Sequence, residues 1–138
     1  MRYEFMGLAS EVPLDWSDET TVTFTIPAVD IEGEPVSPGN LVINWAESAG
    51  TDASTYLEQL KIELAQAFNA FEVLEEGEAE PGLPFVRFRF AAGRDLQQIL
   101  YVRVFGERAV ICTGTAMTEY FTDLRERFDD VARSIEAL

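Results

Sequence analysis

The sequence contains no histidine and only one cysteine. Histidine is the commonest general base and the commonest metal ligand in proteins, so its absence removes the usual centre of both kinds of site. One cysteine, Cys112, excludes an internal disulfide and a zinc site built on thiolates. The chain also lacks a nucleophile elbow, a phosphate-binding loop and a dinucleotide-binding glycine motif. These absences argue against an enzyme, and we predict no metal and no cofactor.

Long apolar runs are missing as well. No stretch approaches the roughly 18 residues that a membrane-spanning helix needs. The first five residues lack the apolar core of a signal peptide. Together with the lone cysteine, which suits a reducing compartment, these features predict a cytoplasmic protein without stable direct membrane association.

Positive charge is scarce, and the net charge is −15. Residues 1–86 hold 17 acidic and 2 basic residues, whereas residues 87–138 hold 8 of each. An acidic field of this kind repels nucleic acid and anionic membranes and favours a basic partner, but it also simply keeps a protein soluble. The length of 138 residues predicts a single domain that spans residues 1–138.

Apolar periodicity predicts two helices and several short strands. The helices, at residues 53–71 and 119–137, carry apolar residues at spacings of three and four, and Asp52 or Ser54 can cap the first one. Residues 29–40 are predicted as a loop and residues 75–82 as an acidic turn. The predicted strands lie at residues 3–8, 20–26, 41–45, 85–90, 97–105 and 109–115, with a further edge strand at 73–74.

The order of these elements predicts an α+β fold. Short connections between the last three strands leave no room for crossover helices, so these strands form an antiparallel meander. We therefore expect one antiparallel β-sheet with the helices packed on one face.

Asp15 and Asp18 form the most suggestive acidic pair. They are candidates for paired carboxylates or calcium ligands, but no twelve-residue calcium loop with its closing glutamate surrounds them. Aspartate also stabilises turns through its own backbone, and we interpret the segment as a turn before the strand at 20–26.

A diffuse pattern runs along almost the whole chain. It begins with a proline, a tryptophan, an aspartate, two threonines and a phenylalanine before and within the strand at 20–26, and it continues through the first helix to the last strand. Its residues are Pro13, Trp16, Asp18, Thr20, Thr21, Phe24, Asn40, Tyr56, Leu57, Gln59, Leu60, Gly82, Gln97, Gln98, Thr113, Gly114, Thr115 and Ala116. In this pattern the chain resembles the DcrB-related Eag chaperones, which accompany effectors of bacterial type VI secretion.

The resemblance implies a fold, a function and a set of contact residues. The fold is similar to that of PsbP, and the function is that of a cytoplasmic chaperone and adaptor. Such a chaperone acts as a homodimer, shields the N-terminal transmembrane helices of an effector and aids its loading on the spike. Where the family commonly has a basic residue after the Leu41-Val42-Ile43 run, this chain has Trp45. The implied client-binding residues are Val22, Phe24, Leu41, Ile43, Gln59, Gln98, Leu100 and Val102. A competing interpretation places the apolar residues of this set in the core against the two helices.

A second function remains open from composition. An acidic inhibitor, such as an immunity protein, would bind a cationic partner through electrostatic steering. This alternative explains the charge but not the ten phenylalanines.

Overall fold

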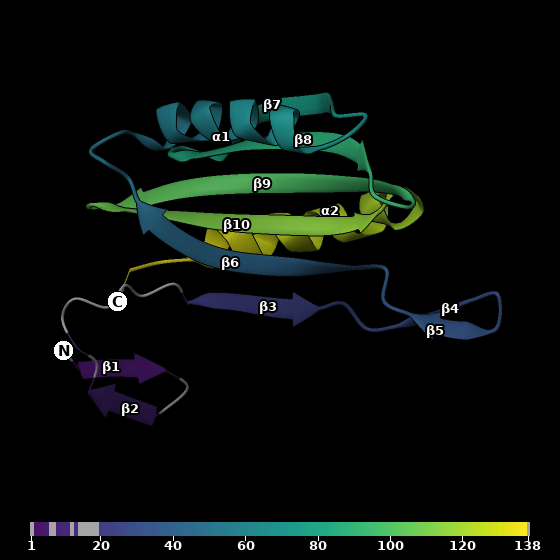
Figure 1. The fold of residues 1–138 in the computed structure, drawn as a ribbon, viewed down its shortest axis with the longest axis horizontal. Coiled ribbons are helices and arrows are strands. Elements are labelled where there is room, and N and C mark those ends of the chain that lie inside the picture. Colours follow the sequence, from purple (N-terminus) through teal and green to yellow (C-terminus); the bar gives the residue numbers. More distant parts are fainter. Residues whose placement is uncertain (1, 6–7, 12, 14–19, 138) are drawn as a thin grey trace.

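The computed structural model describes residues 2–5, 8–11, 13 and 20–137. Its largest element is a six-stranded antiparallel sheet with the strand order β3-β6-β10-β9-β8-β7 (Figure 1). The strands are β3 (Thr21–Thr25), β6 (Gly39–Glu47), β7 (Glu72–Glu80), β8 (Leu83–Ala91), β9 (Asp95–Phe105) and β10 (Arg108–Met117). The predicted α+β class, with an antiparallel sheet and two packed helices, is confirmed.

The meander β8-β9-β10 forms as the sequence predicts. Each strand extends by up to two residues beyond the predicted bounds. Turns at Gly93 and Gly106 join the strands with φ values of +76° and +61°, a backbone conformation that glycine adopts without a steric penalty. Short turns of this kind leave antiparallel pairing as the only option.

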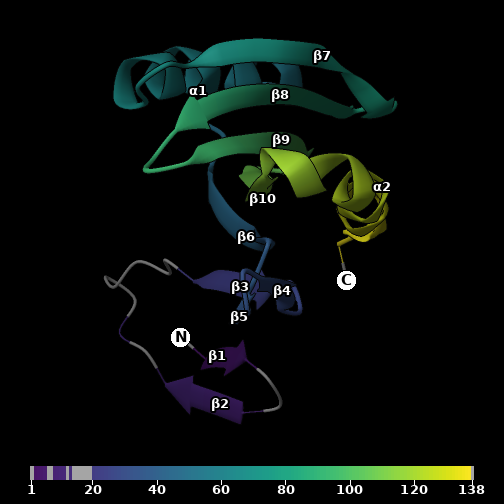
Figure 2. The same cartoon turned by 90° about the vertical axis from the view of Figure 1, so that its right-hand side faces the viewer.

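The two helices, α1 (Ala53–Ala67) and α2 (Thr118–Ser134), pack on opposite faces of the sheet, as the two perpendicular views show (Figures 1 and 2). The expectation that both helices cover one face is therefore wrong. On β9, Leu100 packs in the cluster under α1, whereas its neighbour Tyr101 packs in the cluster under α2. Successive residues of a strand point to opposite faces, and β8 and β9 are apolar on both, so each face needs its own cover.

Two hydrophobic cores result, one on each side of the sheet. The α1 core consists of Leu57, Val86, Phe88, Phe90, Leu100, Val102, Ala109 and Ile111. The α2 core consists of Leu41, Leu83, Phe85, Ile99, Tyr101, Cys112, Ala116, Phe121, Leu124, Phe128 and Ala132.

Helix α1 ends at Ala67, four residues before the predicted end. Phe68 and Phe71 nevertheless stay on the apolar stripe and pack against β8. The ring of Phe68 stacks on Phe90 with centroids 4.4 Å apart, and Phe71 lies 4.8 Å from Phe88. The periodicity thus identified the contacts correctly but overestimated the length of the helix.

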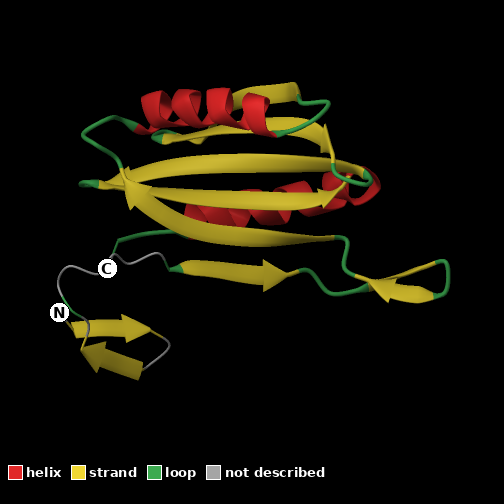
Figure 3. Ribbon diagram, in the orientation of Figure 1, coloured by secondary structure: helices red, strands yellow, loops and turns green. Residues whose placement is uncertain are grey.

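Three segments differ from the predictions (Figure 3). The expected loop at 29–40 contains a hairpin of β4 (Val29–Ile31) and β5 (Glu34–Val36), whose turn is closed by a 2.9 Å hydrogen bond from Gly33 N to Asp30 Oδ1. The expected acidic turn at 75–82 belongs mostly to β7, an edge strand whose glutamates resemble a solvated connector in the sequence.

The expected strand at 3–8 is instead a separate pair of strands, β1 (Arg2–Phe5) and β2 (Leu8–Glu11). Trp16 and the predicted turn around Asp15 and Asp18 lie outside the described residues. In the part of the chain that the structure describes, no helix is long and apolar enough to cross a membrane.

Candidate functional site

One part of the main sheet carries no helix. Helix α1 lies over β8 and β9, and the described residues place no helix on the same face over β3, β6 and the second half of β10 (Figure 1). We call this area the open sheet surface. Its side chains are Thr21, Thr23, Thr25, Asn40, Val42, Asn44, Gln98, Thr113 and Thr115.

Strand register aligns these side chains in rows across four strands. One row runs from Gln98 on β9 through Thr115 on β10 and Asn40 on β6 to Thr25 on β3. Neighbouring strands lie about 4.8 Å apart, so three intervals give a width of about 14 Å. An α-helix with its side chains is about 10–12 Å wide, and one such helix fits this surface.

The exposure of these side chains agrees with the lack of a covering helix among the residues that the structure describes. Val42 and Thr113 are half-buried although their strands lie inside the sheet, whereas Val86 and Phe88 beneath α1 are completely buried. The three threonines of β3 are exposed. Most side chains here are short and polar, so a partner's backbone can approach closely and find hydrogen-bonding groups.

The adjacent glutamines of β9 have different environments. Gln97 lies on the α2 face, and its Oε1 accepts a 2.9 Å hydrogen bond from Nη1 of Arg87. Gln98 lies on the open sheet surface and is half-buried. Among the described residues, no side-chain hydrogen bond involves its amide. Gln98 is therefore the glutamine that is available to a ligand.

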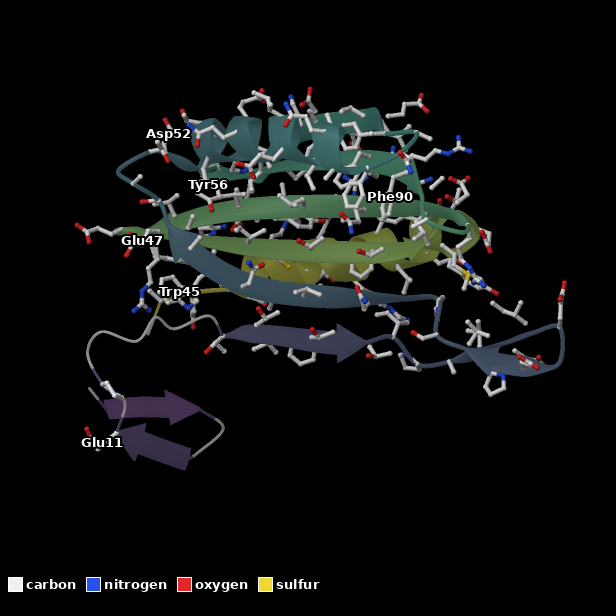
Figure 4. All side chains as sticks on the ribbon, viewed as in Figure 1. Glu11, Trp45, Glu47, Asp52, Tyr56 and Phe90 are labelled. Carbon is white, nitrogen blue, oxygen red and sulfur yellow. The ribbon has the colours of Figure 1, made fainter. Side chains whose placement is uncertain are left out.

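Helix α1 forms one border of the open sheet surface. Tyr56 projects from α1 on its sheet-facing side and packs partly against the α1 core (Figure 4). Burial, helped by the neighbouring Glu63 carboxylate, raises the pKa of the Tyr56 phenol, which keeps its proton for donation at neutral pH. Gln59 is exposed on the side of α1 away from the sheet, since Tyr56 and Leu60 face the core.

The structure does not bring the eight predicted client-binding residues together. Val22, Phe24, Leu41 and Ile43 lie on the α2 face, because Ile43 pairs with Cys112 and Leu41 pairs with Gly114. Leu41 is buried in the α2 core, whereas Phe24 is 56% exposed.

Only the β9 residues of that set lie on the α1 face. Leu100 and Val102 share this face with Gln98, as the sequence alternation predicts, but both are buried in the α1 core. Gln98 is thus the one predicted residue that the structure places on the open sheet surface.

A second, polar groove lies between α2 and β7, and the sequence analysis missed it. It has a volume of about 320 Å³ and is lined by side chains of both signs, including Glu75, Arg125, Asp129 and Arg133. Glu75 accepts hydrogen bonds of 2.7 Å from Arg125 and 3.2 Å from Arg87. Its partners lie 12 and 50 positions away along the chain, so no local pattern could have revealed the cluster.

The hydrogen bonds of this groove connect α2 to the sheet, and the pKa values of Glu75 and Tyr101 are shifted there. The Arg125 hydrogen bond lowers the pKa of the Glu75 carboxyl, and the Arg87 bond adds to the effect. Burial and a hydrogen bond to Asp129 raise the pKa of Tyr101, which therefore stays a phenol. Because the opposite charges pair with one another, we assign this groove a structural role.

Trp45 occupies the α2 face near the end of β6 (Figure 4). The Arg108 guanidinium lies over its ring, 4.6 Å from the centroid. Here a tryptophan with an arginine of the neighbouring strand β10 stacked on it stands where the chaperones that the sequence resembles commonly have a basic residue.

The comparisons with known proteins establish the fold. No protein-family model matches the chain, and no curated protein has a significantly similar sequence. Among solved structures, PA94 from Pseudomonas aeruginosa, a protein of unknown function described as a candidate regulator, has a TM-score of 0.79 at 15% identity, with 100% of this chain and 96% of PA94 covered. Cyanobacterial PsbP (CyanoP) from Synechocystis sp. PCC 6803 has a TM-score of 0.51 at 12% identity, with 93% of this chain and 98% of CyanoP covered. The chain therefore has a PsbP-like fold.

Proposed function

We propose that this chain is a cytoplasmic chaperone and adaptor that shields the N-terminal transmembrane helices of a type VI secretion effector and aids its loading on the spike. The sequence resemblance to the Eag chaperones motivates the proposal. The observation that carries it is the open sheet surface, which is about one helix wide and presents the amide of Gln98, for which the described residues offer no side-chain hydrogen bond.

The chemistry of the open sheet surface suits a transmembrane helix. Such helices associate through small residues that allow close approach and through side-chain hydrogen bonds, rather than through a hydrophobic gradient. Thr113, Thr115 and Val42 present short side chains on which a helix can lie closely. The Gln98 amide can donate to and accept from polar groups of the client that would otherwise be unsatisfied.

The proposed contact residues differ in part from the expected set. Gln98 remains in the set, at the α1 border of the open sheet surface, and Thr113, Thr115, Val42 and Asn44 continue the surface across β10 and β6. Leu100 and Val102 support the surface from the core and do not touch the client. The resemblance also implies a homodimer, which we include in the proposal.

Gln98→Ala tests the site directly. The probe is the N-terminal apolar region of the effector encoded beside this chain's gene, co-purified or titrated with the chaperone. Intramembrane hydrogen bonds contribute about 0.6–2 kcal/mol, so we expect binding to weaken by about 3- to 30-fold with the melting temperature unchanged.

Gln97→Ala is the matched control, because it removes an identical side-chain amide from the opposite face of the same strand. The amide of Gln97 bonds to Arg87 and does not reach the open sheet surface. It should leave client binding unchanged. If Gln97→Ala weakens binding while Gln98→Ala does not, the client lies on the α2 face. If neighbouring genes encode no protein with an N-terminal apolar region, the chaperone function itself is wrong.

The concentrated charge favours a second candidate function, an acidic inhibitor of a cationic protein. All of the net −15 arises in residues 1–86, which include the β4–β5 hairpin with Asp30, Glu32 and Glu34. Such a protein would bind through long-range attraction, which salt screens.

A further inference from the structure

The outer edge of β3 is a row of backbone groups that no described strand pairs with. β3 is the terminal strand of the main sheet, and no other described strand pairs with its outer side. A 3.0 Å hydrogen bond from Ile26 N to Gly39 O shows that residue 26 directs its N–H toward β6. Because this direction alternates along a strand, Val22 and Phe24 also face β6, whereas Thr21, Thr23 and Thr25 direct N–H and C=O groups to the outer edge.

The two edges of the sheet differ in their protection against pairing. β7, at the opposite edge, carries five glutamates and two register shifts, both of which discourage the addition of another strand. β3 has no charged residue and a continuous register with β6. In a chain with a net charge of −15, such an edge puts no like charges directly opposite one another when two copies pair along it.

We infer that β3 pairs with β3 of a second copy, antiparallel, about a twofold axis at Thr23. In this register Thr23 faces the partner's Thr23, and Thr21 faces the partner's Thr25. All three outward-facing residues then exchange backbone hydrogen bonds, about six in total. The inference rests on the proposed homodimer but not on any client.

Side chains on both faces are complementary in the same register. Phe24, which is 56% exposed in the single chain, packs against the partner's Val22 on the α2 face. On the other face threonines meet threonines. Aromatic with β-branched pairs and threonine pairs are both favourable across strands. The two sheets then become one, and the open sheet surfaces of both copies become continuous.

Light scattering of the chain without client is the first measurement. We expect twice the chain mass of 15.5 kDa as the concentration rises through the micromolar range. Thr23→Pro removes only an N–H that faces outward, so β3 stays paired with β6 and the dimer dissociation constant rises about tenfold or more. Thr23→Val keeps the N–H and should keep the dimer.

Disulfide trapping gives a test that does not depend on how Thr23→Pro folds. Thr23→Cys places two thiols across the axis, where Cα atoms of a hydrogen-bonded pair lie about 5.5 Å apart, within reach of a disulfide. We expect a covalent dimer on mild oxidation. Glu78→Cys, on the opposite edge strand, should not crosslink, and the native Cys112 is buried and unreactive.

A wild-type chain that stays at 15.5 kDa overturns the inference, as does a dimer that survives Thr23→Pro and does not crosslink through position 23. Pairing of β3 with an added peptide in place of a second copy would also overturn it. Since no client is present, these results are independent of the Gln98 test.

Discussion

At the scale of single residues, Gly114 shows how closely α2 packs against β10. A Cβ atom at this position would lie 2.6 Å from the ring of Phe128, which is itself buried. We predict that Gly114→Ala lowers the free energy of unfolding by about 1–3 kcal/mol, because the ring has no free space into which to move. Denaturant unfolding measures the change.

Phe128→Leu supplies the control for that prediction. In the Gly114→Ala background the smaller side chain should recover part of the loss, which a double-mutant cycle detects as coupling between the two positions. Strictly additive effects would mean that Gly114 acts through its backbone and not through contact with Phe128.

The ion pairs of Glu75 predict a pH dependence. The Arg125 hydrogen bond lowers the pKa of Glu75, so the carboxylate stabilises the fold above its unfolded pKa, and this stabilisation is lost as pH falls through the folded value. The Glu75 side chain is 40% exposed, so the contribution is small, up to about 1 kcal/mol.

We therefore expect Glu75→Gln to be less stable than wild type at pH 7, with the difference disappearing in acid. Urea unfolding at a series of pH values measures it. Glu126→Gln, which removes an exposed charge from α2, serves as the control and should show no such trend. If the difference in the free energy of unfolding between wild type and Glu75→Gln persists at low pH, the effect of the substitution comes from packing and not from charge.

At the scale of elements, the sequence predicts Asp52 or Ser54 as the N-cap of α1, and the structure shows that the cap is Asp52. Asp52 Oδ1 accepts a 2.7 Å hydrogen bond from Thr55 N, and this bond lowers the pKa of Asp52. Asp52→Ala should destabilise the protein in thermal or denaturant unfolding, because it removes this N-cap hydrogen bond. Ser54→Ala, two residues further along the chain, should be nearly neutral. Equal effects of the two changes would show that Asp52 does not act as the cap.

The elements also show how much of the fold can be predicted from the sequence. Alternation in Phe85 to Phe90 predicts β8 and both of its faces, because the signal is local. Only residues 73–74 of β7 are predicted as an edge strand, because such a strand pairs on one side only and its glutamates look like those of a loop. Similarly, periodicity shows that α1 and α2 each have an apolar stripe but not which sheet face each stripe covers.

The candidate site follows the same rule. Gln98 could be identified as a residue that shares a face with Leu100 and Val102, and the structure agrees. The grouping of these residues with Val22 and Phe24 depends on the register between β6 and β10, whose strands are far apart in the chain. A change of one residue in the register of a strand moves its side chains to the opposite face of the sheet. No local sequence pattern reveals such a change.

At the scale of the whole molecule, salt separates the two candidate functions. A chaperone that cradles an apolar helix should bind with nearly constant affinity as salt rises. An acidic inhibitor should lose affinity steeply, because screening weakens attraction between exposed charges. We predict the first behaviour when the effector's N-terminal region is titrated at low and high salt. A steep loss of affinity would favour the inhibitor.

The strand order β3-β6-β10-β9-β8-β7 has a consequence for how the chain folds during its synthesis. β6 pairs with β10, and even its closest pair, Glu47 with Arg108, is 61 positions apart along the chain. Closing such a long loop costs entropy that the short turns of β8-β9-β10 avoid. β6 therefore leaves the ribosome before its partner strand β10 exists. We expect the meander to form first and to recruit β6, and then β3, as the last strand to be ordered.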